Sequence, residues 1–320
     1  MTNLFITLGP ATLKKDFLKS LEPKYVKLLR INLSHTDIND LPKVVKYIRK
    51  YSKIDICFDT EGAQIRTSKI KNKIKILKRD NYIYINKDNK NNDNISLMPN
   101  GIHQKLRIND NLYIDFNSAQ IKIISENSKT FKCKVIEGGI IGSNKSISVN
   151  RNINIPPFTE KDMLAIELAK ELNIKNIALS FTSNAKDVRT LRSYFEKKVI
   201  ITSKIESKKA LANLDEILEE ADKILIDRGD LSKEIPLHMI PKKQKEIIYT
   251  ANRKKVPVFV ATNLLESMVT KQEPTRAEVN DIYNTLIDGA DGLVLAAETA
   301  IGKYPRKCID MVIKVSKTLK

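Results

Sequence analysis

The sequence has few residues of the types that build thiolate and imidazole metal sites. Its 320 residues include three cysteines and three histidines, all far apart along the chain, and no two cysteines form a CxxC motif. A zinc site is therefore not expected. Cys57 lies inside an apolar segment, which predicts a thiol packed in the core. This cysteine usage is typical of a reduced, cytoplasmic protein.

Long apolar runs are also lacking. No stretch of eighteen consecutive apolar residues occurs, so neither a membrane-spanning helix nor a membrane partner is expected. The first segment, MTNLFITLGPATLKK, places apolar residues before its lysines and lacks the basic start of a signal peptide, so we interpret it as a strand. A hydrophobic content of 42% suits a soluble globular protein with a sizeable core.

Acidic residues are in the minority. The chain has 56 Lys and Arg residues against 38 Asp and Glu residues, which gives a formal net charge of +18. A basic field of this size can mark nucleic-acid binding. The lysines are scattered, however, as in KNKIKILKRD and NKDNKNN, and do not gather on one helix with aromatic residues between them. We therefore expect no nucleic-acid partner, although the field would attract phosphorylated substrates.

Apolar segments alternate with helical patterns along most of the chain. Such alternation favours an α/β fold with parallel strands. Eight strand–helix units in roughly 230 residues match a (β/α)8 TIM barrel, whose usual size is ~250 residues. The expected strands lie near residues 4–9, 25–32, 54–60, 176–181, 199–206, 223–230, 256–262 and 292–298, and expected helices include residues 12–21, 40–51, 160–172 and 238–255.

The alternation breaks between residues 67 and 152. Short strand-like pieces such as YIYI, LYIDF, QIKII and FKCKVI are separated there by Asn, Asp and Gly, which are turn residues. This pattern predicts an inserted small β-barrel that serves as a lid domain, residues 67–152. The barrel domain would then consist of residues 1–66 and 153–320.

Polar residues follow the ends of several expected strands, which meet at one rim in a parallel barrel. Lys204 and Glu206 are two residues apart in a strand and so share a face, and Asp230 ends the next strand. Two carboxylates suit a hard divalent cation such as Mg²⁺. An adjacent lysine can neutralise charge on a phosphoryl or enolate oxygen. The alternative is a structural ion pair between Lys204 and Glu206 in the barrel core.

Other strands end in further candidate active-site groups. Thr262 and Glu298 end the last two strands, and Gly229 lets the backbone approach an anion closely. Arg30 and Arg66 would suit a phosphate group, since guanidinium binds phosphate bidentately. Four oxygen-bearing residues could together hold a monovalent cation, namely Asn32, Ser34, Asp59 and Thr60. The two arginines, or this group of four, could instead be solvated loop ends.

A series of motifs, in its order and spacing, resembles the pyruvate kinase family over the whole barrel and its insertion. The motifs are TLGPAT, LLRINLSH, FDTEGAQIRTS, GSNKS, TSKIES, DRGDLSKEIP, ATNLLESM, EPTRAE, DGADG and AAETAIGKYP. That family transfers phosphate between phosphoenolpyruvate and ADP with a divalent metal and usually K⁺. The resemblance thus implies Mg²⁺ or Mn²⁺, ADP or ATP, and phosphoenolpyruvate or pyruvate as ligands.

The resemblance also implies roles by position. Glu206 and Asp230 would hold the divalent ion, and Lys204 would stabilise the phosphoryl group and the enolate. Thr262 and the amides of Gly229 and Asp230 would bind the substrate carboxylate. The other implied roles are phosphate binding by Arg30 and Arg66, monovalent-ion binding by Asn32, Ser34, Asp59 and Thr60, and nucleotide contacts by His35 and Lys145.

The chain departs from the family pattern mainly on the nucleotide side and around proton delivery. Gln64 replaces a glutamate linked to K⁺ dependence, which predicts a weakened or lost K⁺ requirement. Leu13 replaces an arginine, and residues 115–117 read DFN in place of DDG, which together predict weak ADP binding. Further departures are Glu61 for a lysine, Asp227 for an alanine beside the metal strand, and AAET for SGET at residues 296–299.

The chain ends at the helix after AAETAIGKYP, where the family continues into a C-terminal regulatory domain. The resemblance therefore implies a truncated form without that domain or its effector site. The family associates partly through barrel contacts near the segment that matches residues 273–278. This predicts a homodimer at most, with Arg276 near the interface.

Three functions fit these residues, and we rank them in the order given. The first is pyruvate kinase chemistry between phosphoenolpyruvate and ADP with Mg²⁺, without sugar-phosphate allostery. The second is a specialised paralogue that keeps the phosphoenolpyruvate/enolate half-site and uses a different acceptor in a biosynthetic pathway. The third is a non-catalytic binding protein, which the intact set of Lys204, Glu206 and Asp230 disfavours.

Overall fold

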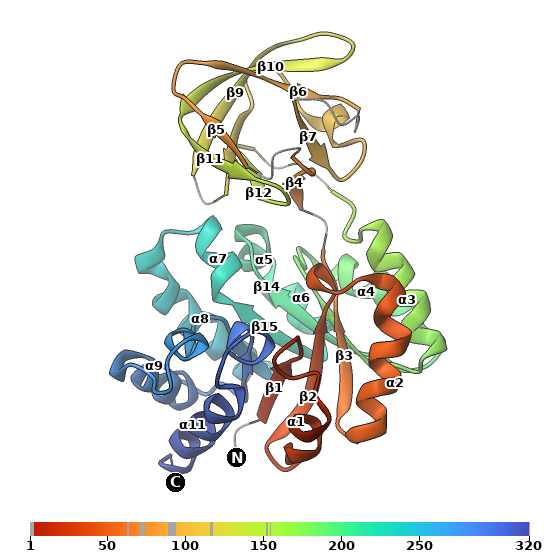
Figure 1. The fold of residues 1–320 in the computed structure, drawn as a ribbon, viewed down its shortest axis with the longest axis vertical. Coiled ribbons are helices and arrows are strands. Elements are labelled where there is room, and N and C mark those ends of the chain that lie inside the picture. The colour runs from red at the N-terminus through yellow and green to blue at the C-terminus, as the bar shows by residue number, and fades with distance from the viewer. Residues whose placement is uncertain are drawn as a thin grey trace. The chain divides into compact units, whose positions relative to one another are not determined.

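The computed structural model describes residues 3–62, 64–70, 74–88, 94–115, 118–151, 153 and 155–319. The chain forms two compact units, the first from residues 1–62 and 157–320 and the second from residues 63–156 (Figure 1). The expected boundaries at residues 67 and 152 fall inside the second unit, because β4 (Ile65–Thr67) pairs with strands of that unit.

The first unit is a closed barrel of eight parallel strands within the described residues, which confirms the predicted TIM barrel (Figure 1). Two of these strands, β3 and β13, pair directly although residues 63–156 lie between them in the sequence. Each predicted strand overlaps an observed one, in order β1 (Asn3–Thr7), β2 (Val26–Asn32), β3 (Asp55–Asp59), β13 (Asn176–Leu179), β14 (Ile200–Ile205), β15 (Lys223–Asp227), β16 (Val258–Ala261) and β17 (Gly292–Leu295).

The barrel interior changes from apolar to polar toward the carboxyl ends of its strands. Its middle is filled by Phe5, Leu28, Cys57, Ala178, Leu225, Phe259, Ala261 and Val294. Residues two positions further along a strand share the same face. The interior therefore continues into a set of side chains that we call the polar layer, namely Thr7, Arg30, Asp59, Ser180, Lys204 and Asp227.

Helices and short turns alternate with the barrel strands. In α2, Leu41, Val45 and Ile48 recur at helical spacing and are buried, so one face of the helix packs on the core. None of the helices in the described ranges is long and apolar enough to cross a membrane. The helices are α1 (Lys15–Ser20), α2 (Leu41–Tyr51), α3 (Glu160–Glu171), α4 (Ala185–Ser193), α5 (Lys208–Ala212), α6 (Leu214–Glu220), α7 (Arg228–Glu234), α8 (Ile240–Arg253), α9 (Arg276–Ile287), α10 (Ala297–Ala300) and α11 (Pro305–Lys317), and η1 (Leu33–His35) follows β2.

The second unit contains a closed barrel of seven strands, counted over its described residues, and confirms the predicted inserted β-barrel. In β9, Ala119, Ile121 and Ile123 are buried while the residues between them are partly exposed, which is the alternation of a strand with one apolar face. The barrel strands are β4, β6 (Tyr82–Asn86), β7 (Ile95–Met98), β8 (Asn111–Ile114), β9 (Ala119–Glu126), β10 (Thr130–Glu137) and β12 (Ser146–Val149), and β5 (Ile74–Leu77) pairs with β11 (Gly139–Gly142).

The three cysteines are free and buried, which confirms the core thiol predicted at Cys57. Burial raises the pKa of each thiol to about 12. The thiols are therefore protonated at neutral pH and poor nucleophiles.

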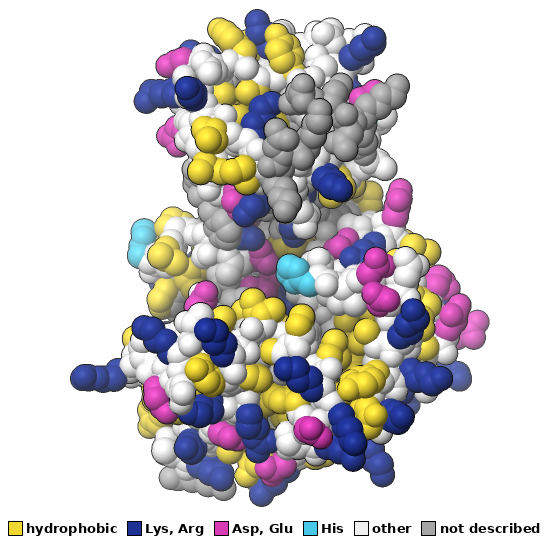
Figure 2. All heavy atoms as spheres, in the orientation of Figure 1, with side chains coloured by type: hydrophobic (Ala, Val, Ile, Leu, Met, Phe, Trp, Pro, Cys, Tyr) yellow, Lys and Arg dark blue, Asp and Glu magenta, His cyan; other side chains and the backbone are white. Residues whose placement is uncertain are grey.

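Basic side chains are spread over the surface. Figure 2 shows Lys and Arg scattered among acidic and apolar side chains on the visible face. Several of them pair with nearby acids, as Arg192 does with Asp222 at 2.9 Å and Lys254 with Glu219 at 2.9 Å. The scattering of lysines along the sequence thus has its counterpart on this face of the molecule.

One buried carboxylate ties together the two segments that lead into and out of the second unit. Asp162, in the first turn of α3, accepts hydrogen bonds from the amides of Glu61 at 2.7 Å, Gly62 at 3.1 Å and Thr159 at 3.0 Å. Its side chain is fully buried. Lys161 Nζ also donates to Glu61 Oε1 at 3.0 Å. The chain therefore leaves and re-enters the first unit at one anchored point.

We expect Asp162→Asn to destabilise the first unit by about 1–3 kcal/mol, because the new amide group cannot accept all three hydrogen bonds and leaves a buried donor unsatisfied. Urea unfolding followed by circular dichroism measures the shift in midpoint. Glu160→Gln, an exposed change in the same helical turn, is the matched control. Equal midpoints for Asp162→Asn and the wild type would show that the three hydrogen bonds do not contribute to the free energy of unfolding.

Candidate active site

Four neighbouring strands bring charged and polar side chains together at the carboxyl end of the barrel. Lys204 Nζ, which is almost completely buried, lies 2.8 Å from Glu206 Oε1. It also lies 3.6 Å from an oxygen of Asp59 and 3.6 Å from an oxygen of Asp227. Ser180 Oγ accepts a hydrogen bond from the same ammonium at 3.1 Å. Three carboxylates and one hydroxyl thus surround a single buried cation.

Burial and neighbouring charges act in opposite directions on these groups. Burial alone would lower the pKa of Lys204, but the three surrounding carboxylates outweigh it and raise that pKa. Burial raises the pKa of Glu206 to about 8 against the opposing charge of Lys204. The carboxylates of Asp230 and Asp227 add to that rise. Lys204 therefore stays charged, and Glu206 lies where an additional cation would be favourable.

Arg30, on β2, is fixed from two sides. Its Nε donates to Asp59 Oδ2 at 2.8 Å, and its Nη2 contacts the same oxygen. Its Nη1 donates to Thr7 Oγ1 at 2.8 Å. The guanidinium is therefore oriented by β1 and β3, and it places a second cation in the polar layer.

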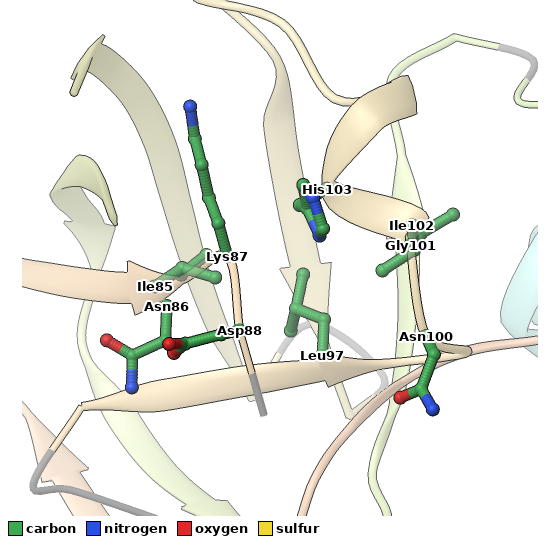
Figure 3. A pocket seen from close by; sticks show the side chains of 9 residues that line it. All are labelled: Ile85, Asn86, Lys87, Asp88, Leu97, Asn100, Gly101, Ile102 and His103. Carbon is green, nitrogen blue, oxygen red and sulfur yellow. The ribbon is translucent and has the colours of Figure 1, made fainter. Parts of the chain in front are cut away.

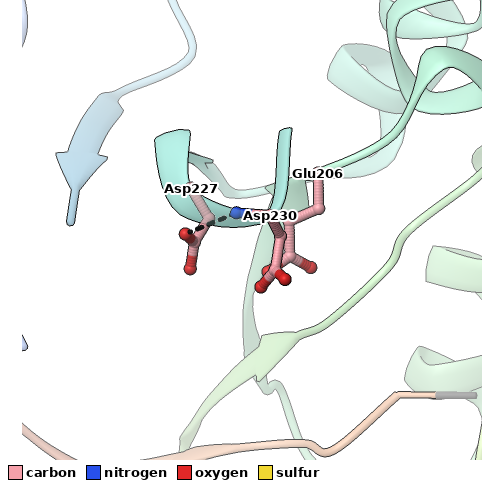
Figure 4. A group of neighbouring side chains, drawn as sticks. All are labelled: Glu206, Asp227 and Asp230. Atoms are coloured by element: carbon pink, nitrogen blue, oxygen red, sulfur yellow. Dashed lines mark hydrogen bonds between the residues drawn. The ribbon is translucent and has the colours of Figure 1, made fainter. Parts of the chain in front are cut away.

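Three carboxylates come close enough together to hold a metal ion. Glu206, Asp227 and Asp230 each offer an oxygen, and these oxygens lie within 4.8 Å of one another (Figure 4). Glu206 Oε2 accepts the amide of Phe181 at 2.6 Å. Glu206 Oε1 is buried, and Lys204 meets it without the geometry of a hydrogen bond. Because carboxylate oxygens are preferred ligands of Mg²⁺ and Mn²⁺, this donor set fits a divalent cation.

Thr262 stands at a strained position directly after β16. Its φ of 69° lies in the left-handed region, which is costly for a β-branched residue. The hydroxyl Oγ1 accepts the amide of Gly229 at 2.8 Å, and the carbonyl accepts Arg228 Nε at 3.1 Å. Asp281 holds that arginine at 2.7 Å. These contacts fix Thr262 beside the first turn of α7.

The four residues predicted to hold a monovalent ion follow or end β2 and β3. Asn32 and Asp59 pair across those two strands, and Asn32 Oδ1 accepts the amide of Ser34 at 2.9 Å. Thr60 Oγ1 accepts the amide of Ser180 at 2.9 Å. The carboxylate of Asp59 already faces both cations of the polar layer. Any ion held by this group would therefore share its carboxylate with them.

Glu298 is engaged by the backbone. It is almost completely buried in α10, where its Oε2 accepts the amide of Ala296 at 2.8 Å and its Oε1 accepts the amide of Leu265 at 3.2 Å. This pattern joins the loop after β16 to the end of β17. These contacts hold two loops together, and the catalytic role predicted for Glu298 stays a prediction.

Two predicted phosphate-binding residues belong to the second unit. Arg66, on β4, donates from Nη1 to the carbonyl of Asn144 at 3.2 Å. Lys145 Nζ pairs with Asp115 Oδ2 at 2.8 Å. The rest of the DFN segment, residues 116–117, lies outside the described residues.

The residues expected around the nucleotide differ in their surroundings. His35, on η1, is exposed. Leu13, which stands in place of an arginine, packs partly buried against the core of the first unit. Gln64 Oε1 is buried and accepts no hydrogen bond from the described residues.

The second unit has a pocket of about 300 Å³ that is lined only by residues of this unit (Figure 3). Its lining combines apolar residues such as Leu97 with Lys87, Asp88 and His103. Lys87 pairs with Glu126 at 2.5 Å. None of the predicted site residues lines this pocket.

Comparison with known proteins identifies the family of this chain. The family described as "Pyruvate kinase, barrel domain" matches residues 1–309. The chain belongs to the pyruvate kinase family. Similar proteins named pyruvate kinase come from Methanocaldococcus jannaschii (35% identical), Thermococcus litoralis (33%) and Thermotoga maritima (33%). Each comparison covers 99% of this chain, and they cover 69%, 69% and 70% of those proteins in turn.

Membership of the pyruvate kinase family confirms the resemblance read from the motifs. It supports a pyruvate kinase-like function and an enzyme of the phosphotransferase class. The structure adds two groups that the sequence did not single out as site residues. Ser180 accepts a hydrogen bond from Lys204, and Thr7 accepts one from Arg30. Ser180 lies at the end of a predicted strand, residues 176–181, for which no site residue was predicted. The alternation of inward and outward residues along β1 and β13 could have indicated that Thr7 and Ser180 face the barrel interior.

We expect Glu298→Gln to lower the thermal midpoint while folded protein keeps phosphotransferase turnover within a few-fold of wild type. The reason is that glutamine can accept only one of the two buried amides, which costs about 1–3 kcal/mol. Differential scanning calorimetry and steady-state kinetics on the same preparations measure both effects. The exposed change Glu266→Gln is the control. Unchanged stability together with a hundredfold loss of turnover would instead support a catalytic role for Glu298.

Proposed function

We propose that this protein transfers a phosphoryl group between phosphoenolpyruvate and ADP with Mg²⁺ or Mn²⁺. The observation that carries the proposal is the position of Lys204, a buried cation 2.8 Å from Glu206 in a cluster of oxygen ligands. Family membership supports the same reaction class. The barrel, residues 1–62 and 157–320, would be the catalytic domain.

Glu206 and Asp230 would hold the divalent ion, which neutralises phosphate charge when it is bound. Asp230 pairs with Lys233, and Glu206 is oriented by the amide of Phe181, so both ligands are held by their surroundings. This arrangement of ligands on rigid elements supports a preformed ion site.

Lys204 would stabilise the negative charge that develops on the phosphoryl or enolate oxygen. The surrounding carboxylates raise the pKa of Lys204 in spite of its burial, so the side chain would keep its charge. Arg30, oriented by Asp59 and Thr7, would add a second positive charge toward the phosphate. A fixed cation in a water-poor site acts most strongly where charge appears in the transition state.

Thr262 and the amides of Gly229 and Asp230 would bind the substrate carboxylate. The hydroxyl of Thr262 and the amide of Gly229 are already hydrogen-bonded to each other at 2.8 Å. A carboxylate could take the amide from the hydroxyl, and the hydroxyl could donate to it by turning away from the carbonyl of Ala261, to which it donates at 2.6 Å. The organic part of the substrate would then lie at the end of β16.

The second unit would act as a lid that carries nucleotide contacts. Arg66 and Lys145 are its cationic residues with implied phosphate roles, and His35 is the corresponding residue of the first unit. Lid motions of this kind sequester the reacting groups from water. On this basis ADP or ATP is the proposed second ligand.

A second candidate function is favoured by one observation on the nucleotide side. Leu13 packs against the core and offers no polar group where the family usually has an arginine. A specialised paralogue with phosphoenolpyruvate/enolate chemistry and a different phosphoryl acceptor would fit that change. Pyruvate formation with each nucleoside diphosphate separates the two, since the paralogue would bind phosphoenolpyruvate and Mg²⁺ without nucleotide-dependent turnover.

We expect Lys204→Met to reduce kcat for pyruvate formation by a factor of about 10²–10³ with a smaller change in KM, because an oxyanion-type contact is worth about 3–4 kcal/mol in the transition state. A lactate dehydrogenase-coupled assay gives both constants. Lys204→Arg keeps the buried charge and separates loss of folding from loss of chemistry. Lys208→Met, an exposed change on α5, is the control, and near-full activity of Lys204→Met would refute the assignment.

We expect little or no activation by K⁺, because Gln64 removes a negative charge that the family links to the monovalent-ion site. Initial rates in K⁺ and in tetramethylammonium at equal ionic strength measure the effect. Gln64→Glu should increase K⁺ activation if the missing charge is the cause. Large, saturable activation of the wild type by K⁺ would contradict the expectation.

A further inference from the structure

Asp227 brings a third carboxylate to the pair that would hold the divalent ion. It ends β15 and is 5% exposed. One of its oxygens lies within 4.8 Å of the ligand oxygens of Glu206 and Asp230. Its Oδ2 lies 3.6 Å from Lys204 Nζ. This side chain therefore faces both the proposed ion and the proposed catalytic lysine.

The fold explains why Asp227 points into the site. Leu225, two residues earlier on β15, belongs to the apolar cluster inside the barrel. The period of a strand then turns Asp227 to the same interior face. The resemblance gives alanine at this position in the family, so Asp227 is a feature of this chain and Asp227→Ala restores the common residue.

The added charge changes the balance of the polar layer. Arg30 and Lys204 supply two positive charges, and Asp59, Glu206 and Asp227 supply three negative charges in their ionised forms. Asp230 and Lys233 pair with each other and add one charge of each sign, so together they leave this sum unchanged. When Glu206 is ionised, as a metal ligand must be, the polar layer together with Glu206 has one excess negative charge, and with alanine in place of Asp227 it would be neutral. An excess negative charge attracts a cation and repels an anion.

The same carboxylate also faces a backbone group that the substrate would use. Asp227 Oδ1 accepts the amide of Asp230 at 3.5 Å, as the dashed line in Figure 4 marks. That amide is one of the two donors proposed for the substrate carboxylate. A substrate anion must therefore approach a position that a protein carboxylate already faces.

We propose that Asp227 is a third carboxylate of the divalent-ion site, which strengthens binding of the ion in the absence of substrate and lowers the affinity of this chain for the anionic substrate. The inference rests on the proposed function, since it assumes the ion site at Glu206 and Asp230. Binding would then be ordered, with the metal entering first and supplying the positive charge that the substrate needs.

The first test uses Mn²⁺ alone on the full chain, with free Mn²⁺ followed by electron paramagnetic resonance. Wild-type protein should bind one Mn²⁺ without substrate. Asp227→Asn and Asp227→Ala should weaken that binding about tenfold or more, in the range seen when a partner of a metal site is removed. Asp215→Asn, which removes a largely exposed carboxylate from α6, should bind Mn²⁺ as the wild type does.

The second test measures phosphoenolpyruvate binding by calorimetry at saturating Mn²⁺. Asp227→Ala should bind phosphoenolpyruvate several-fold more tightly than the wild type. Opposite changes for the cation and the anion are the signature of a charge effect, because a purely structural defect would weaken both. Asp227→Asn is nearly isosteric, so it carries the test if the alanine variant does not fold.

Glu206→Gln separates failure of this inference from failure of the proposed function. If Glu206→Gln abolishes Mn²⁺ binding while Asp227→Asn binds as the wild type does, the role of Asp227 is refuted and the ion site stands. If Glu206→Gln binds Mn²⁺ as the wild type does, with or without phosphoenolpyruvate, the ion site of the proposed function is refuted as well. Weaker Mn²⁺ binding together with weaker phosphoenolpyruvate binding in Asp227→Ala would assign Asp227 a structural role only.

Discussion

The buried charge balance around Lys204 is the constraint on which the candidate site depends. Removing one partner from a group of buried charges leaves another uncompensated, at a cost of several kcal/mol. Asp59 faces both Arg30 and Lys204, so one carboxylate links β2, β3 and β14 at their carboxyl ends. Asp227 extends the link to β15. The charges of the candidate site therefore also connect the ends of neighbouring barrel strands.

Much of this arrangement can be predicted from the sequence, because the barrel strands are short apolar segments separated by helical patterns. The pairs Lys204 with Glu206 and Leu225 with Asp227 follow from strand period alone. The residues that meet across neighbouring strands do not follow from strand period. Asp59 was predicted as a ligand of a monovalent ion, and that role stays a prediction. Its contacts with Arg30 on the preceding strand and with Lys204 on β14 were not predicted. Strand period gives the face of a residue, and only barrel closure decides what it meets there.

Side chains that bind backbone amides were the hardest to foresee. Glu298 and Asp162 accept amides from residues distant in sequence, and nothing in their local motifs indicates those donors. The position of β4 shows the same limit on a small scale. This strand has only three residues, too few to show the alternation of a strand. The first boundary between the units was therefore expected at residue 67 and lies at residues 62–63. In each case the information lies in loop geometry, which composition does not encode.

The direct pairing of β3 with β13 has an evolutionary consequence. To the barrel, residues 63–156 are a loop whose two ends are fastened at one carboxylate, and the second unit has a hydrophobic core of its own. Since the closure of one domain does not depend on what fills the other, mutations can accumulate in the insertion without disturbing the barrel rim. Gln64 and the altered segment at residues 115–117 fall in the insertion, while Leu13 and Asp227 are departures within the barrel. Because each module has its own hydrophobic core, substitutions in one leave the core of the other in place, and the two can change separately within a lineage.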